Sequence, residues 1–159
     1  MFKDALPSKV NPSRDISDPA VHLADWVVAM PHFEVQIHEE ALGGEESPVS
    51  GQLIEKLTEA ALTVYPESFR KLVGVELFGI PAGRWGVGGK VTDEPSPIVT
   101  LRSREGLFHH PDFVGAPARL ISAITDAVVA VLGESVRERV MVRLVGIPAG
   151  RSGLGGELT

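Results

Sequence analysis

The chain has 159 residues, of which 43% are apolar and 23% charged, a balance typical of a folded globular protein rather than a disordered one. Its net charge of -6, with 15 basic residues scattered among 21 acidic ones, argues against a nucleic-acid partner, because phosphate binding needs a concentrated basic surface. The absence of cysteine excludes disulfides and thiolate chemistry and suits a cytoplasmic location. No apolar run approaches the roughly 18 residues of a membrane span, so we expect no membrane partner.

Residues 1–29 precede the first regular pattern and are expected to form an N-terminal extension. Polar and proline-broken clusters up to residue 17 predict a flexible arm. Asp18 followed by Pro19 suits an N-cap and a first helical residue, and the apolar residues after them predict a helix of about ten residues. The early charges, without a continuous apolar segment, do not indicate a secretion signal.

The first strand, helix and second strand are predicted between Met30 and Ile80. Period-two alternation marks a strand that begins at Met30–Pro31 and buries Phe33, Val35 and Ile37. An acidic, glycine-containing loop is expected over residues 39–46. Apolar residues at helical spacing predict a helix that begins between residues 47 and 50 and is ended by Pro66: Leu53, Ile54, Leu57, Ala61 and Val64. A second strand is predicted over Val73–Ile80.

The same order of elements follows a linker over residues 92–96. A strand is predicted over Pro97–Ser103, then a loop up to Ala116, a helix over Pro117–Leu132 and a strand over Val140–Ile147. Gly133 directly follows the helix and is its expected C-cap.

The second half of the chain repeats the first. In ungapped register, residues 53–89 and 120–156 share 20 identities in 37 positions, and Gly79–Lys90 matches Gly146–Glu157 at nine of twelve positions. A repeat at a fixed offset is the signature of tandem modules. We therefore expect two βαβ modules, over residues 30–91 and 97–159, that form one domain.

This organisation predicts an α/β (α+β) fold with a four-stranded sheet and two helices on one face. Two strands joined by a helix are expected to be parallel, and each module alone leaves only a marginal two-stranded sheet. Pairing the modules edge to edge gives the larger sheet. Its second face stays bare, and we expect homo-oligomerisation to cover it.

Each module opens with a proline-led strand and closes with a glycine-rich stretch. The opening segments are Met30–Ile37 and Pro97–Leu101, and the closing segments are Arg84–Gly89 and Arg151–Gly156. In this combination the chain, from Met30 onward, resembles the tautomerase superfamily and its fused members, in which two modules like 4-oxalocrotonate tautomerase share one chain. The resemblance implies a homotrimer, without cofactor or metal, that acts on a small-molecule carboxylate.

In that family the catalytic group is an N-terminal proline, exposed when the initiator methionine is removed. The resemblance makes Pro31 the candidate base and places Trp85 where an aromatic residue lines the family's pocket. A free α-amine titrates at about 8, and burial or neighbouring cations lower that pKa, so the amine can be a neutral base at about pH 7. It can then move a proton between carbon and oxygen of an enol.

The family's substrate-binding arginines have no direct counterparts, because other residues occupy their places: Ala41, Gly74, Leu107 and Met141. Arg104, at the end of the second module's first strand, and Arg143, in its second strand, are the predicted substitutes that bind the carboxylate. His38 occupies the place in the first module that matches Arg104, and it is a further substrate-binding candidate.

Pro31 is preceded by 30 residues, so its nitrogen in the full chain is a tertiary amide without basicity. Three explanations stay open: translation begins at Met30, the extension is removed by processing, or the fold does not use proline chemistry. Pro97 occupies the matching place and can never be N-terminal, so a proline there can simply begin a strand.

The predicted function is a cofactor-independent tautomerase, an isomerase that acts on a small 2-oxo or enol carboxylic acid. One alternative is a non-catalytic tautomerase-fold oligomer whose N-terminal extension blocks proline chemistry. Another is a dehalogenase or decarboxylase of small acids.

The glycine-rich stretches are expected to be tight turns rather than phosphate-binding loops. The spacing around Gly89 fits neither a Walker A motif nor Gly-x-Gly-x-x-Gly, whereas glycine readily adopts positive φ in a hairpin turn. His109, His110 and Asp112 lie in a polar loop and lack the convergent spacing of a metal site.

Overall fold

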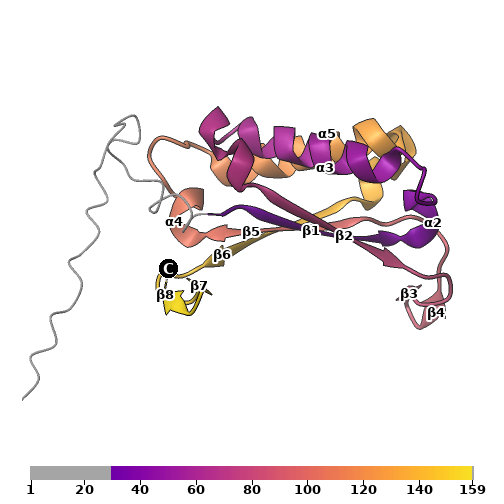
Figure 1. Ribbon diagram of the computed structural model, residues 1–159. Helices are drawn as coiled ribbons and strands as arrows, with labels where there is room; N and C mark the ends of the chain where they lie inside the picture. Colours follow the sequence, from indigo (N-terminus) through magenta and orange to yellow (C-terminus); the bar gives the residue numbers. More distant parts are fainter. Residues whose placement is uncertain (1–29, 159) are drawn as a thin grey trace, which may run out of the picture.

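A computed structural model describes residues 30–158, which form one four-stranded sheet with both long helices on the same face (Figure 1). The strand order is β2 (Gly74–Ile80), β1 (His32–His38), β5 (Ile98–Arg104) and β6 (Met141–Ile147). Strands β1 and β2 are parallel, as are β5 and β6, and the modules meet through the antiparallel pair β1 and β5. The predicted fold is confirmed. The arm and the short helix expected within residues 1–29 lie outside the described residues.

The two long helices, α3 (Val49–Leu62) and α5 (Ala116–Leu132), lie side by side over the sheet (Figure 1). Helix α5 ends at the predicted C-cap, Gly133, whose φ of 97° is strained for any residue with a side chain. Helix α3 ends at Leu62, ahead of the expected stop at Pro66. No helix within the described part of the chain is long and apolar enough to cross a membrane.

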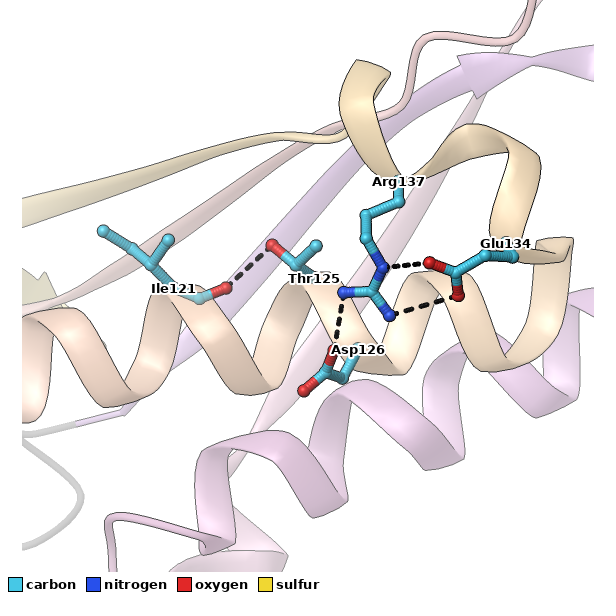
Figure 2. A network of polar contacts seen from close by, with 5 residues as sticks. All are labelled: Ile121, Thr125, Asp126, Glu134 and Arg137. Atoms are coloured by element: carbon cyan, nitrogen blue, oxygen red, sulfur yellow. Dashed lines mark hydrogen bonds and ion pairs between the residues drawn. The ribbon is translucent and has the colours of Figure 1, made fainter.

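Each long helix is followed by a 3-10 turn that the sequence patterns did not indicate: η1 (Glu67–Leu72) and η2 (Glu134–Arg139). Figure 2 shows how η2 is tied to α5. Arg137 donates hydrogen bonds to both carboxylate oxygens of Glu134 and, at 2.8 Å, to Asp126 of the helix. These exposed ion pairs link η2 to α5 just before the chain enters β6.

Short helices replace the expected loops after the first strand of each module. Residues 39–46 begin with α2 (Glu39–Leu42), and the second loop begins with α4 (Glu105–Phe108). The expectation of a loop was wrong there, because four residues are too few to show a helical period. Glycine on the neighbouring strand leaves room for the turn: a Cβ on Gly79 would lie 3.2 Å from the Cβ of Glu39.

One hydrophobic core lies between the sheet and the helices and is shared by both modules. Its members from the two central strands, and from the helices above them, are fully buried: Phe33, Val35, Ile37, Leu57, Val99, Leu101, Leu120, Ile124 and Val128. Burying such side chains stabilises the fold by about 1.5–3 kcal/mol each. Because the core contains residues from both modules, neither module has a complete core of its own.

The opposite face of the sheet is uncovered within the single chain, and we call it the bare face. By strand alternation and register it carries His32, Glu34, Gln36 and His38 of β1 and their partners on the other strands. Large apolar side chains are exposed on it, with Phe78 at 45% and Met141 at 48%. Exposed apolar side chains gathered on one face often mark an interaction surface.

Two small hairpins stand on the side of the bare face, at opposite ends of the sheet (Figure 1). They are β3 (Gly86–Val87) with β4 (Lys90–Val91), and β7 (Gly153–Leu154) with β8 (Glu157–Leu158). Gly88 and Gly89 form the first turn with φ of 60° and 78°. Positive φ at both turn residues suits a two-residue hairpin, so the glycine-turn prediction is confirmed.

Tyr65 gives a prediction about stability. Its hydroxyl has no hydrogen-bond partner among residues 30–158, although the side chain is 2% exposed, and burial raises its pKa to about 12. Its ring packs against Phe69 and Phe113, with centroids 5.4 and 5.2 Å away. Leaving a buried hydroxyl unsatisfied costs about 1–3 kcal/mol, so Tyr65→Phe should raise the free energy of unfolding by about 1 kcal/mol in urea denaturation.

Tyr65→Leu is the control for this prediction. It removes the same hydroxyl together with both ring contacts, and it should lower the free energy of unfolding. If Tyr65→Phe also lowers it, the hydroxyl makes a stabilising hydrogen bond and the prediction fails.

Candidate functional site

Pro31 and Pro97 have the same place in the two modules. Each is buried at the start of the module's first strand. The carbonyl of Pro31 accepts a hydrogen bond from the amide of Gly74 at 3.0 Å, and the carbonyl of Pro97 accepts one from Met141 at 2.9 Å. Both prolines therefore begin a parallel strand pair, and this part of their role is structural.

The antiparallel pairing of β1 and β5 creates two ends of the sheet with different residues. His32 pairs with Arg102, so extending the register places Ser103 opposite Pro31 and the last residue of β5, Arg104, one position further, opposite Met30. We call this the Arg104 end. The β7–β8 hairpin, which follows β6, stands there near α4 (Figure 1).

The other end is formed by the last residue of β1, His38, and the start of β5 at Pro97. We call it the His38 end. Trp85 lies there, just before the β3–β4 hairpin, and its ring centroid is 4.8 Å from that of His38 with an interplanar angle of 84°. His38 and Trp85 line one pocket together.

The five predicted site residues are therefore not brought together within one chain. Pro31 lies with Arg104, whereas His38 lies with Trp85, and the length of β1 separates the pairs by about 20 Å. Arg143 is in the middle of β6, where it pairs with Thr100 and alternates onto the bare face with Arg104.

Arg102 is a cation on the bare face that the sequence analysis did not single out. It donates hydrogen bonds of 3.0 and 3.1 Å to the two carboxylate oxygens of Glu34. The hydrogen bond from Arg102 holds the pKa of the Glu34 carboxyl below its usual value. The signal that could have found it is its position two residues before Arg104, which places both on the same face of β5.

The two loop histidines contact groups within their own segment. The ring of His109 lies 2.9 Å from a carboxylate oxygen of Glu105, and His110 accepts a hydrogen bond from the amide of Asp112 at 3.2 Å. Within residues 30–158 no three histidine, aspartate or glutamate side chains are grouped as metal ligands would be.

Comparison with protein-family profiles gives no match, and no curated protein matches the sequence. Solved structures do match. A fused 4-OT, described as an asymmetric trimer, superposes with a TM-score of 0.63 at 26% identity, covering 80% of this chain and 95% of that one. The chain has the tautomerase-superfamily fold in its fused, two-module form. The resemblance predicted from the opening and closing segments is confirmed.

Two further neighbours of this tautomerase-fold chain share its architecture. Pt0534, whose crystal structure was obtained after inactivation by 2-oxo-3-pentynoate, has a TM-score of 0.63 at 20% identity and covers 81% of this chain and 96% of its own. N1, a member of the cis-3-chloroacrylic acid dehalogenase family, has a TM-score of 0.62 at 23% identity, with 80% and 82% covered. At these identities the likeness concerns the fold alone.

The two ends of this tautomerase fold differ in chemistry at matched positions. Arg104, Gly106 and Ser152 in the second module stand where the first module has His38, Glu40 and Trp85. The Arg104 end thus carries an arginine in place of the histidine and lacks the indole. Anion binding favours arginine, because the guanidinium pairs with a carboxylate through two hydrogen bonds.

Proposed function

We propose that the protein is a cofactor-independent tautomerase that acts on a small 2-oxo or enol carboxylic acid at the Arg104 end. The observation that carries this proposal is the buried Pro31 at the start of β1, at the same sheet end as Arg104. The structural likeness to a fused 4-OT at 26% identity supports the same reaction class. Pro31 acts as the base in the form whose chain begins with it.

The proposed chemistry is a transfer of one proton. The neutral imino nitrogen of an N-terminal Pro31 takes a proton from the enol oxygen, or from the carbon next to a carbonyl, and returns it to the other atom. Arg104 and Arg143, which share the bare face, bind the carboxylate and stabilise the negative charge that develops on oxygen. A cation beside an amine also lowers the pKa of that amine, which keeps Pro31 neutral.

This chemistry requires a free nitrogen on Pro31. In the chain of 159 residues that nitrogen is bonded to Met30 as an amide, which holds no exchangeable proton and has no basicity. The active form therefore begins at Pro31, either because translation starts at Met30 and the methionine is removed, or because processing removes the extension.

The intact mass of protein produced from the native gene tests which form exists, and an assay tests which form works. We expect the chain of 159 residues to be inactive in ketonisation of an enol acid and the form that begins at Pro31 to be active. Both proteins are compared at equal chain concentration after their masses are checked. Equal turnover by the two forms would contradict the proposed role of the Pro31 nitrogen.

We further propose that the protein is a homotrimer located in the cytoplasm. Trimeric fused 4-OT structures share its fold, and the bare face exposes Phe78 and Met141 in the single chain. A trimer would bury apolar side chains of this face.

A second candidate is a non-catalytic tautomerase-fold oligomer whose extension blocks the site. It is favoured by the placement of Trp85 at the end of the sheet remote from Pro31, and by the amide bond between Met30 and Pro31 in the chain as written. Detection of only the mass of the 159-residue chain in cells would support it. Release of chloride from a chlorinated acrylic acid, without ketonisation, would instead favour the dehalogenase alternative.

A further inference from the structure

The His38 end contains a pocket that the proposed tautomerase reaction does not use. The pocket is a shallow, open hollow between α2, the end of β2 and the segment after β4, and its enclosed space is about 20 Å³. A ligand there must be small, and much of it stays exposed to solvent.

Backbone hydrogen bonds hold the walls of this pocket. The amide of Thr92 donates to the carbonyl of Trp85 at 2.9 Å and closes the segment around the β3–β4 hairpin. The amide of Arg84 donates to the carbonyl of Pro81 at 3.2 Å, and Gly83 within that turn has a φ of 80°. The indole is therefore presented by a defined turn before any ligand arrives, which lowers the ordering cost of binding.

The charged side chains that line the pocket are acidic. Glu40 and Asp93 face it, and no lysine or arginine is among its lining residues in the described chain. An indole with two nearby carboxylates attracts a cation, because the ring face is negative and the acids add their own charge. The same arrangement repels the carboxylate substrate proposed for the Arg104 end.

His38 adds an imidazole nitrogen that lacks a hydrogen-bond partner within the described residues. Its Nε2 atom is buried and makes no hydrogen bond with any residue from 30 to 158. Its ring meets that of Trp85 at a steep angle, so this unpaired nitrogen belongs to a ring that packs directly on the indole.

The second module has different side chains at the positions that match His38, Glu40 and Trp85. His38, Glu40 and Trp85 are replaced there by Arg104, Gly106 and Ser152, so one end lacks both the acid and the aromatic ring and carries an arginine instead. The flanking Ile-Pro-Ala-Gly-Arg segment is the same in both modules. Among the residues that line the pocket, the differences thus include an acid and an aromatic ring.

We propose that the His38 end is a second binding site, which takes a small organic cation of the alkylammonium class. The cation lies against the indole of Trp85, and Glu40 and Asp93 balance its charge. This site is separate from the anion site at the Arg104 end, and it goes beyond the proposed tautomerase function without depending on it.

Titration of the full chain with tetramethylammonium chloride, followed by the indole N–H resonance of Trp85 in two-dimensional NMR, tests this proposal. Trp26 gives an internal reference signal, and sodium chloride at the same concentration controls for ionic strength. We expect a saturable shift of the Trp85 resonance. Sodium acetate and the uncharged near-isostere tert-butanol should bind at least about tenfold more weakly.

Calorimetric titrations of variants with the same probe separate the site from a general charge effect. Trp85→Ser, which copies the second module, should weaken tetramethylammonium binding about tenfold, and Trp85→Phe should weaken it about threefold at most. Glu40→Gln should weaken it about threefold or more. Glu45→Gln, an exposed acid outside the pocket, is the matched control and should leave the Kd unchanged.

The proposal is overturned if Trp85→Ser binds tetramethylammonium with the same Kd as the unaltered protein. Preference for acetate over tetramethylammonium at Trp85 would overturn it equally. Because the variants lie about 20 Å from Pro31, failure of this proposal leaves ketonisation by the Pro31 form intact, and failure of the tautomerase proposal leaves cation binding intact.

Discussion

Ketonisation of an enol acid by the form that begins at Pro31 is expected to fall about a hundredfold in kcat/KM when Pro31 is replaced by alanine. A positioned general base contributes about 10² to 10⁴ in rate, and an N-terminal alanine keeps an amine, so the lower value applies. The loss arises because alanine has a freely rotating amine, whereas the proline ring holds its nitrogen rigidly at the strand start. Steady-state assays of both proteins with one enol acid measure the effect.

Pro97→Ala is the matched control that the repeat supplies. Pro97 is buried, begins a strand and offers its carbonyl to the next strand just as Pro31 does, yet its nitrogen is always an amide. This variant should keep kcat/KM within about twofold while changing thermal stability as Pro31→Ala does. If Pro97→Ala loses activity as strongly as Pro31→Ala, both effects come from the strand start, and Pro31 is not the base.

Phe78→Glu is expected to convert the proposed trimer into single chains. Phe78 is 45% exposed on the bare face of the isolated chain and becomes buried if that face is covered by other copies. A carboxylate buried there without a partner costs several kcal/mol per site, which is enough to reverse a typical association. Light scattering during size-exclusion chromatography should show the mass fall from three times the 17.0 kDa chain to that of one chain.

Ile54→Glu is the control for assembly. Ile54 is 43% exposed but belongs to α3, on the covered side of the sheet, so the same apolar-to-acid change is made at nearly equal exposure away from the bare face. We expect the proposed trimer to persist in this variant. Loss of the trimer in Ile54→Glu with its retention in Phe78→Glu would place the interface on the helices and contradict the bare-face proposal.

Much of the fold could be predicted from local patterns. The alternation of Phe33, Val35 and Ile37 predicted β1 because side chains on one strand face are all buried against the helices. The glycine pairs predicted the hairpin turns because positive φ is costly for other residues. The short helix α2 was missed, since its four residues are too few to show a helical period and it packs beside Gly79, a distant part of the chain.

The candidate site was predicted less completely than the fold. Pro31, Arg104, His38, Trp85 and Arg143 were selected as one set, because positions in a repeat reveal which residues correspond but not which of them meet. The antiparallel register between β1 and β5 assigns Trp85 to the end that holds Pro97. Period and spacing within a module carry no information about the direction in which two modules pair.

The sequence by itself determined that the chain contains two related βαβ modules with proline-led strands and glycine turns, because these features depend on residues near one another. The tertiary structure alone decided which side chains share an end of the sheet. That outcome depends on long-range pairing of β1 with β5, which places Arg104 with Pro31 and His38 with Trp85. The same pairing leaves an acidic, aromatic pocket at one end and an arginine at the other.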